Sequence, residues 1–128
     1  MVNERVASFK DLLVWKQAMQ LAKACYLVTR SFPKEELYGL TAQIRRASSS
    51  IPANIAEGSG RGSRRDYVQF LRVAQGSVRE LETHLLLSVE VNLVAPQAIG
   101  PIQKQVESVA ILLGKLIRAL SAPKPPTS

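Results

Sequence analysis

Arginine is the residue type whose chemistry stands out in this sequence of 128 residues. All seven basic residues between positions 41 and 80 are arginines, namely Arg45, Arg46, Arg61, Arg64, Arg65, Arg72 and Arg79. This third of the chain carries +4 of the net charge of +7, against +2 for residues 1–40 and +1 for residues 81–128. A guanidinium group offers a planar fork of donors that fits phosphate or carboxylate oxygens. The charge therefore suggests an anionic partner.

Three of these arginines have helical spacing. Arg65, Arg72 and Arg79 are seven residues apart, so on a helix they form one ridge, the arginine ridge, away from the apolar stripe. At about 1.5 Å per residue the ridge is about 21 Å long and can follow several phosphates. Arg61 and Arg64 lie at its upstream end. The alternative is a solvated face whose arginines pair with nearby acidic residues or with neighbouring subunits.

A second surface consists of small side chains. On the second predicted helix, Ala42, Ser49, Ala53 and Ala56 lie away from the core stripe, with Arg46 and Glu57 beside them. Small residues allow another helix to approach closely, and Val73, Leu87 and Val91 are further apolar residues outside the core stripe of the third helix. We interpret this surface as a site of self-association, the alternative being apolar residues scattered on the surface of a monomer.

Candidate catalytic and metal-binding groups are few. His84 flanks a core position and Cys25 occupies one, so both are expected to be packing residues rather than a base and a nucleophile. One cysteine and one histidine are too few for a disulfide or a structural zinc site. The glycine-rich segment 58–63 follows a helix and lacks the ending of a phosphate-binding loop. We therefore predict no enzyme activity, no catalytic residue, no metal and no cofactor.

Apolar residues recur at helical spacing along the whole chain, and no window alternates like a half-buried strand. We predict helices over residues 11–31, 33–58 and 63–92, and a fourth that follows a break at residues 92–96 and ends before Pro123. Asp11 is the expected N-cap of the first helix, and Ser63 that of the third. Short connections imply an all-α, antiparallel up-down four-helix bundle over residues 1–122, followed by a flexible Pro-rich tail at 123–128.

The apolar stripes of the four helices give the expected core. The first consists of Val14, Ala18, Leu21, Cys25 and Val28, and the second of Leu37, Leu40, Ile44, Ala47, Ile51 and Ile55. The third consists of Tyr67, Phe70, Leu71, Ala74, Val78, Leu81, Leu85 and Val89, and the fourth of Ile99, Ile102, Val106, Val109, Leu113, Leu116 and Leu120. No apolar run is long enough to span a bilayer and the first 30 residues lack a secretory pattern, so the cytoplasm is the expected location.

Several long strings resemble one protein family. They are FKDLLVWKQA at 9–18, FPKEELYGLTAQIRRA at 32–47, SIPANIAEG at 50–58, GRGS at 60–63 and ELET at 80–83. These strings resemble the four-helix-bundle proteins encoded within intervening sequences of bacterial large-subunit ribosomal RNA genes. The resemblance covers about residues 9–94.

This resemblance implies a cytosolic homopentamer, related in fold to accessory variability proteins of diversity-generating retroelements, which bind nucleic acid through a basic surface. The matching motif positions are Arg45, Arg46, Asn54, Glu57, Gly58, Arg61 and Gly62. We predict a homo-oligomer that binds nucleic acid, with RNA favoured over DNA. The predicted binding residues are Arg45, Arg61, Arg64, Arg65, Arg72 and Arg79. Its predicted subunit contact consists of Arg46, Ser49, Ala53, Asn54, Ala56 and Glu57. The alternative is a protein-interaction scaffold without direct nucleic-acid binding.

Overall fold

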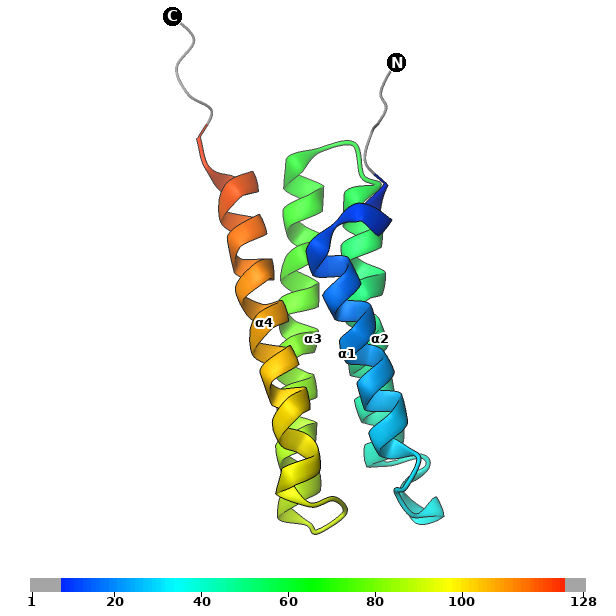
Figure 1. Cartoon of the computed structure of the whole chain (residues 1–128). Coiled ribbons are helices and arrows are strands. Elements are labelled where there is room, and N and C mark those ends of the chain that lie inside the picture. Colours follow the sequence, from blue (N-terminus) through cyan, green and yellow to red (C-terminus); the bar gives the residue numbers. More distant parts are fainter. Residues whose placement is uncertain (1–7, 124–128) are drawn as a thin grey trace, which may run out of the picture.

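The structure, a computed structural model, describes residues 8–123 and contains four α-helices in that range. These are α1 (Leu13–Thr29), α2 (Leu40–Ser59), α3 (Arg64–Glu90) and α4 (Pro96–Ser121). They run alternately down and up, and each contacts its two neighbours around the bundle (Figure 1). The predicted all-α antiparallel four-helix bundle is confirmed.

The core is formed by one stripe from each helix. Fully enclosed side chains include Leu21 of α1, Ile51 of α2, Leu81 of α3 and Val109 of α4. The 3.6-residue period of the apolar residues is the reason, because it puts one face of each helix toward the bundle axis. Of the predicted core residues, Leu37 is wrong, since its side chain is 49% exposed.

Helix α3 ends where the sequence indicates. Asn92 adopts a positive φ of 62°, the left-handed conformation that closes many helices. The amide of Leu93 donates to the carbonyl of Ser88 at 2.9 Å, and that of Asn92 donates to Val89 at 3.0 Å. At the other end, Ser63 accepts a hydrogen bond from the amide of Asp66, as predicted for its N-cap.

The starts of α1 and α2 differ from the predictions. Asp11 does not cap α1, because it ends a short 3₁₀-helix, η1 (Phe9–Asp11), and Leu12 occupies the N-cap position. The second helix begins seven residues later than predicted, after a second 3₁₀-helix, η2 (Lys34–Glu36). The Glu36 carboxylate there accepts a hydrogen bond from the amide of Leu40 at 3.1 Å. Glu36 was expected to lie within the second helix. It instead precedes α2 and accepts a hydrogen bond from one of the free amides of its first turn.

The core stripe of α4 also differs near its end. Ile117 is buried, whereas Leu116 and Leu120, which a strict seven-residue repeat places in the core, are half-buried. An α-helix with 3.6 residues per turn drifts by about 20° per seven residues, so toward the end of α4 the buried face has rotated away from the positions of a strict seven-residue repeat. Of the predicted tail at 123–128, residues 124–128 lie outside the described part of the chain.

Candidate functional site

The connection between α2 and α3 positions the first arginines of the predicted site. Arg61 lies in this turn, where its guanidinium is 2.9 Å from the Glu57 carboxylate and 4.6 Å from the centre of the Phe70 ring. Gly58 allows this arrangement, because a Cβ there would lie 2.9 Å from the Cβ of Phe70. The ion pair and the aromatic ring hold Arg61 against the turn, while Arg64 begins α3 beside it.

The arginine ridge continues along the exposed face of α3. Arg65, Arg72 and Arg79 are all exposed, as predicted. Within residues 8–123, no carboxylate lies within ion-pair distance of Arg65 or Arg72. Arg79 has different surroundings, because it lines a groove of about 230 Å³ between α3 and α4 together with Glu82 and Glu107. The ridge is therefore most strongly basic in its upstream half.

Arg45 lies apart from the ridge. Its Nε donates to the hydroxyl of Thr29 at 2.9 Å, and its guanidinium lies 4.9 Å from the centre of the Tyr26 ring. Both partners belong to α1, so Arg45 links α1 to α2 on a different side of the bundle from α3. The structure does not bring Arg45 together with the other five predicted nucleic-acid-binding residues.

The predicted subunit-contact residues divide into two groups. Arg46, Asn54 and Glu57 have partners within the protomer: Arg46 pairs with Glu80 of α3 at 2.5 Å, and the Asn54 amide donates to the Ser50 carbonyl at 2.8 Å. Ser49 and Ala53 are exposed, and Ala56 is half-buried. The small side chains are therefore the accessible part of this surface, with the polar residues at its edges.

These small residues belong to an uncharged belt around the middle of the bundle. On each helix, at least six consecutive residues carry no charge, over the ranges 17–22, 47–56, 73–78 and 108–114. Three contacts place the four ranges at one level. The Ser108 hydroxyl donates to Gln17 at 2.6 Å, Ser50 and Ser77 share a hydrogen bond of 2.8 Å, and Val78 and Ala110 line the same groove.

The belt carries exposed apolar side chains on three helices. Met19 of α1 is 44% exposed, Val73 of α3 is 53% exposed, and Ile111 of α4 is 57% exposed. Leu87 of α3 and Val91, the residue after its end, were also predicted to lie outside the core and are exposed below the belt at 44% and 51%. Uncharged surface with exposed apolar groups is suited to contact with another protein.

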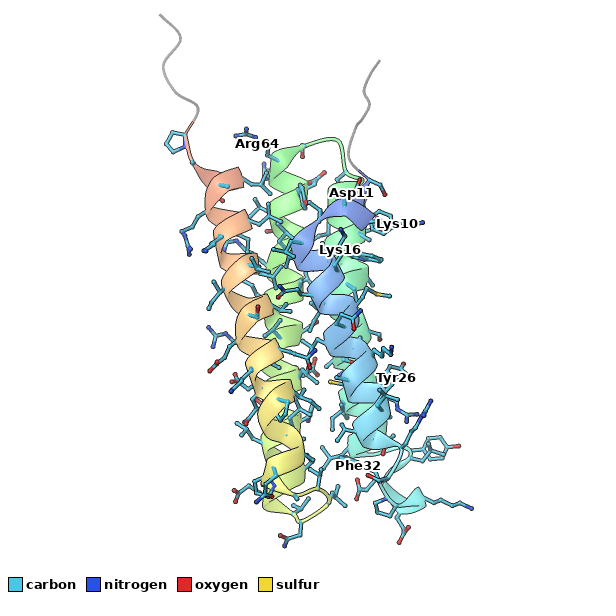
Figure 2. The ribbon with its side chains drawn as sticks, in the orientation of Figure 1. Lys10, Asp11, Lys16, Tyr26, Phe32 and Arg64 are labelled. Carbon is cyan, nitrogen blue, oxygen red and sulfur yellow. The ribbon has the colours of Figure 1, made fainter. Side chains whose placement is uncertain are left out.

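Beyond the belt, basic residues gather at the end where α1 and α3 begin. We call segments 8–16, 57–72 and 115–123 the basic end. Their charged residues are eight basic and three acidic, a net of +5. The basic ones are Lys10, Lys16, Arg61, Arg64, Arg65, Arg72, Lys115 and Arg118. Figure 2 shows Arg64 at the same end as Lys10 and Lys16. The other described residues have seven basic and six acidic side chains, a net of +1.

Sequence reasoning missed four members of this basic end, Lys10, Lys16, Lys115 and Arg118. They are far from the arginine-rich segment in sequence, and a count by thirds of the chain assigns them to weakly charged regions. The predicted up-down topology could have identified these four residues, because it brings the first turns of α1 and α3 and the last turns of α4 to one end.

His84 and Cys25 have the surroundings of packing residues. The His84 side chain is 21% exposed, and its Nε2 lies 3.9 Å from the Glu80 carboxylate. Burial raises the pKa of the Cys25 thiol to about 12, against a smaller lowering by a hydrogen bond from Ser48. A thiol with this pKa is almost never ionised near neutral pH and is a poor nucleophile.

Within residues 8–123, no three His, Cys, Asp or Glu side chains are grouped so that they could bind one metal ion. In the same range, no helix is both long enough and apolar enough to cross a membrane.

Comparisons with known proteins agree with this fold. A crystal structure of a protein of unknown function from the S23 ribosomal protein family of Bacteroides thetaiotaomicron is similar, with a TM-score of 0.75 and 23% sequence identity. The similarity covers 83% of this chain and 99% of that one. No curated protein matches the sequence. The family model described as 23S rRNA-intervening sequence protein matches residues 10–115. This match covers most of the chain, which therefore belongs to the 23S rRNA-intervening sequence protein family.

Proposed function

We propose that this protein is a non-catalytic homo-oligomer of five subunits that binds RNA through its arginine-rich surface. The observation that carries the proposal is the exposure of Arg64, Arg65 and Arg72 without a carboxylate in ion-pair distance among residues 8–123. Exposed cations that are not neutralised locally attract the phosphate backbone whatever its base sequence. The family name refers to an rRNA intervening sequence, which makes RNA the first nucleic acid to test.

The aromatic residues support contact with the backbone rather than with bases. Tyr67 and Phe70, the aromatic residues nearest the arginine ridge, are half-buried, and Phe70 lies under the Arg61 guanidinium. Proteins that read unpaired bases usually present exposed aromatic rings on which the bases stack. Binding through phosphates alone is expected to depend on RNA shape and on salt, and to show little preference for sequence.

The uncharged belt supports self-association. Exposed Ser49 and Ala53 form a smooth surface on α2, and exposed Met19, Val73 and Ile111 lie on the other three helices at the same level. A closed ring needs two different contacting faces on each subunit, and apolar groups around the belt provide more than one. In a pentamer the net charge of +7 per chain rises to about +35, and repeated weak sites gain avidity. The buried free thiol of Cys25 is compatible with the reducing cytoplasm, the location we propose.

Light scattering tests the oligomer. The protomer has a mass of 14.0 kDa, so a pentamer has a mass of about 70 kDa. The variant A53E places a charge in the middle of the belt and should lower the measured mass. The control variant A98E puts the same charge on an exposed alanine of α4 outside the belt and should leave the mass unchanged. A wild-type mass near 14 kDa at micromolar concentration would refute the oligomer.

Fluorescence anisotropy with a labelled RNA hairpin and a labelled DNA duplex tests nucleic-acid binding. We expect binding at about 50 mM salt that weakens steeply as salt rises, and weaker binding for the triple variant R65A/R72A/R79A. The absence of binding by the wild-type protein would refute the proposal. A pull-down partner that stays bound after nuclease treatment would then favour the alternative, a protein-interaction scaffold.

A further inference from the structure

We infer that the RNA lies across the basic end of the bundle, rather than along the length of α3 parallel to the helix axes. This inference rests on the proposed RNA binding and identifies the part of the surface that performs it. It adds Lys10, Lys16, Lys115 and Arg118 to the binding residues. It removes Arg45 and Arg79, which lie beyond the uncharged belt.

Charge is unevenly distributed along the bundle axis. The basic end has a net charge of +5, and the rest of the described chain has +1. The uncharged belt separates the two parts by at least six residues on every helix, or about 9 Å at about 1.5 Å per residue. Because this is about one Debye length at physiological salt, phosphates at the basic end are largely screened from the carboxylates beyond the belt.

A phosphate backbone that ran along α3 would meet carboxylates. Downstream of the belt, α3 carries one arginine, Arg79. It also carries His84 and three glutamates, Glu80, Glu82 and Glu90. Glu82 and, from α4, Glu107 share the groove that Arg79 lines. A nucleic acid that followed the arginine ridge beyond Arg72 would therefore bring its phosphates close to carboxylates, which repel them.

The cations of the basic end come from several helices. Arg64 and Arg65 begin α3, whereas Lys115 and Arg118 lie in the last two turns of α4. Lys10 comes from η1, which is held against α1 by the Phe9 ring at 5.3 Å from that of Trp15. Helix axes in bundles are about 10 Å apart, so these cations are spread over an end face about 20 Å wide. A duplex segment of that length carries about twelve phosphate charges.

Cyclic symmetry would strengthen such a site. Rotation about one axis keeps equivalent residues of all subunits at the same height, so every basic end faces the same side of a ring. Contacts between belts would leave these ends uncovered. The assembled protein would then present one basic ring face to RNA.

The test compares pairs of charge-removing variants in the anisotropy assay with the RNA hairpin. K115Q/R118Q removes two cations from the basic end, and K104Q/R30Q removes two exposed cations from the other part of the chain. Both pairs lower the net charge equally. At about 0.1 M salt, each phosphate contact raises the affinity about eightfold. K115Q/R118Q should therefore weaken binding by tenfold or more. The plot of log affinity against log salt should become less steep by about 1.5 to 2.

A second pair, K10Q/K16Q, repeats the test on η1 and α1, and helical circular dichroism confirms that each variant is folded. The single variant R79Q and the pair K104Q/R30Q should each change the affinity less than threefold. Equal losses for K115Q/R118Q and K104Q/R30Q would overturn the inference, because net charge alone would then explain binding. Failure of the wild-type protein to bind RNA would instead refute the proposed function.

Discussion

The close contact at Gly58 yields the sharpest stability prediction. Gly58 is buried near the end of α2, where a Cβ would lie 2.9 Å from the Phe70 Cβ and 3.2 Å from the Tyr67 carbonyl oxygen. Neither atom is the free end of a flexible side chain, so α3 itself would have to move. Because Phe70 also lies under the Arg61 guanidinium, this movement would disturb the turn that holds Arg61.

The expected effect of G58A combines two opposed terms. Overpacking a buried site typically costs about 1–3 kcal/mol, whereas replacing a helical glycine by alanine gains up to about 1 kcal/mol. Gly76 provides the matched control, because it is exposed within α3 and a Cβ there meets nothing within 4 Å. G76A should therefore be more stable than wild type by about 0.5–1 kcal/mol. The difference between the two variants isolates the packing cost.

Urea denaturation followed by circular dichroism measures both free energies of unfolding. We expect G58A to be less stable than G76A by about 2 kcal/mol, a difference of several degrees in Tm for a domain of this size. Equal stabilisation by both substitutions would show that α2 and α3 separate freely at Gly58. It would refute the conclusion that a glycine is required there for the close approach of the two helices.

Three further predictions concern single side chains. The Cys25 pKa of about 12 lies above its ordinary value of 9.0, so its stabilising effect is complete below about pH 9 and is lost as pH rises toward 12. The free energy of unfolding of wild type should thus fall between pH 9 and 10 by about 1 kcal/mol more than that of C25A, and an equal fall in both would contradict this. Arg46 and Glu80 are 57% and 38% exposed, so a double-mutant cycle with R46Q and E80Q should give a coupling below about 1 kcal/mol; a value above about 2 would show a stronger pair. S77A removes the 2.8 Å hydrogen bond to Ser50 and should lower the free energy of unfolding by about 1 kcal/mol in urea denaturation, whereas unchanged stability would show that this bond contributes nothing.

The fold was largely predictable because helix formation and burial depend mainly on residues that are close together in the sequence. The Ile44, Ile51 and Ile55 spacing on α2 and the Ser63 cap of α3 each depend on residues within a few turns of one another. The errors occur where a residue beyond the helix decides the outcome. Glu36 caps α2 from a separate 3₁₀-helix, so the helix begins at Leu40 although Pro33 offers an acceptable local start.

The candidate site was predictable only where its residues lie on one helix. The spacing of Arg65 and Arg72 correctly indicated one exposed face of α3. The partners of Arg45 on α1, and the carboxylate of Glu107 on α4 beside Arg79, come from residues distant in sequence. Helical periodicity contains no information about such neighbours.

Local sequence patterns are therefore enough to predict the four helices, their core faces, the family and the arginine-rich character of the surface. Which charges lie together depends on how the helices pack. An antiparallel bundle brings the first turns of α1 and α3 beside the last turns of α4, and it aligns four uncharged segments into one belt. Electrostatic attraction depends on distance in space rather than along the chain, so only the folded arrangement turns a net charge of +7 into one basic end.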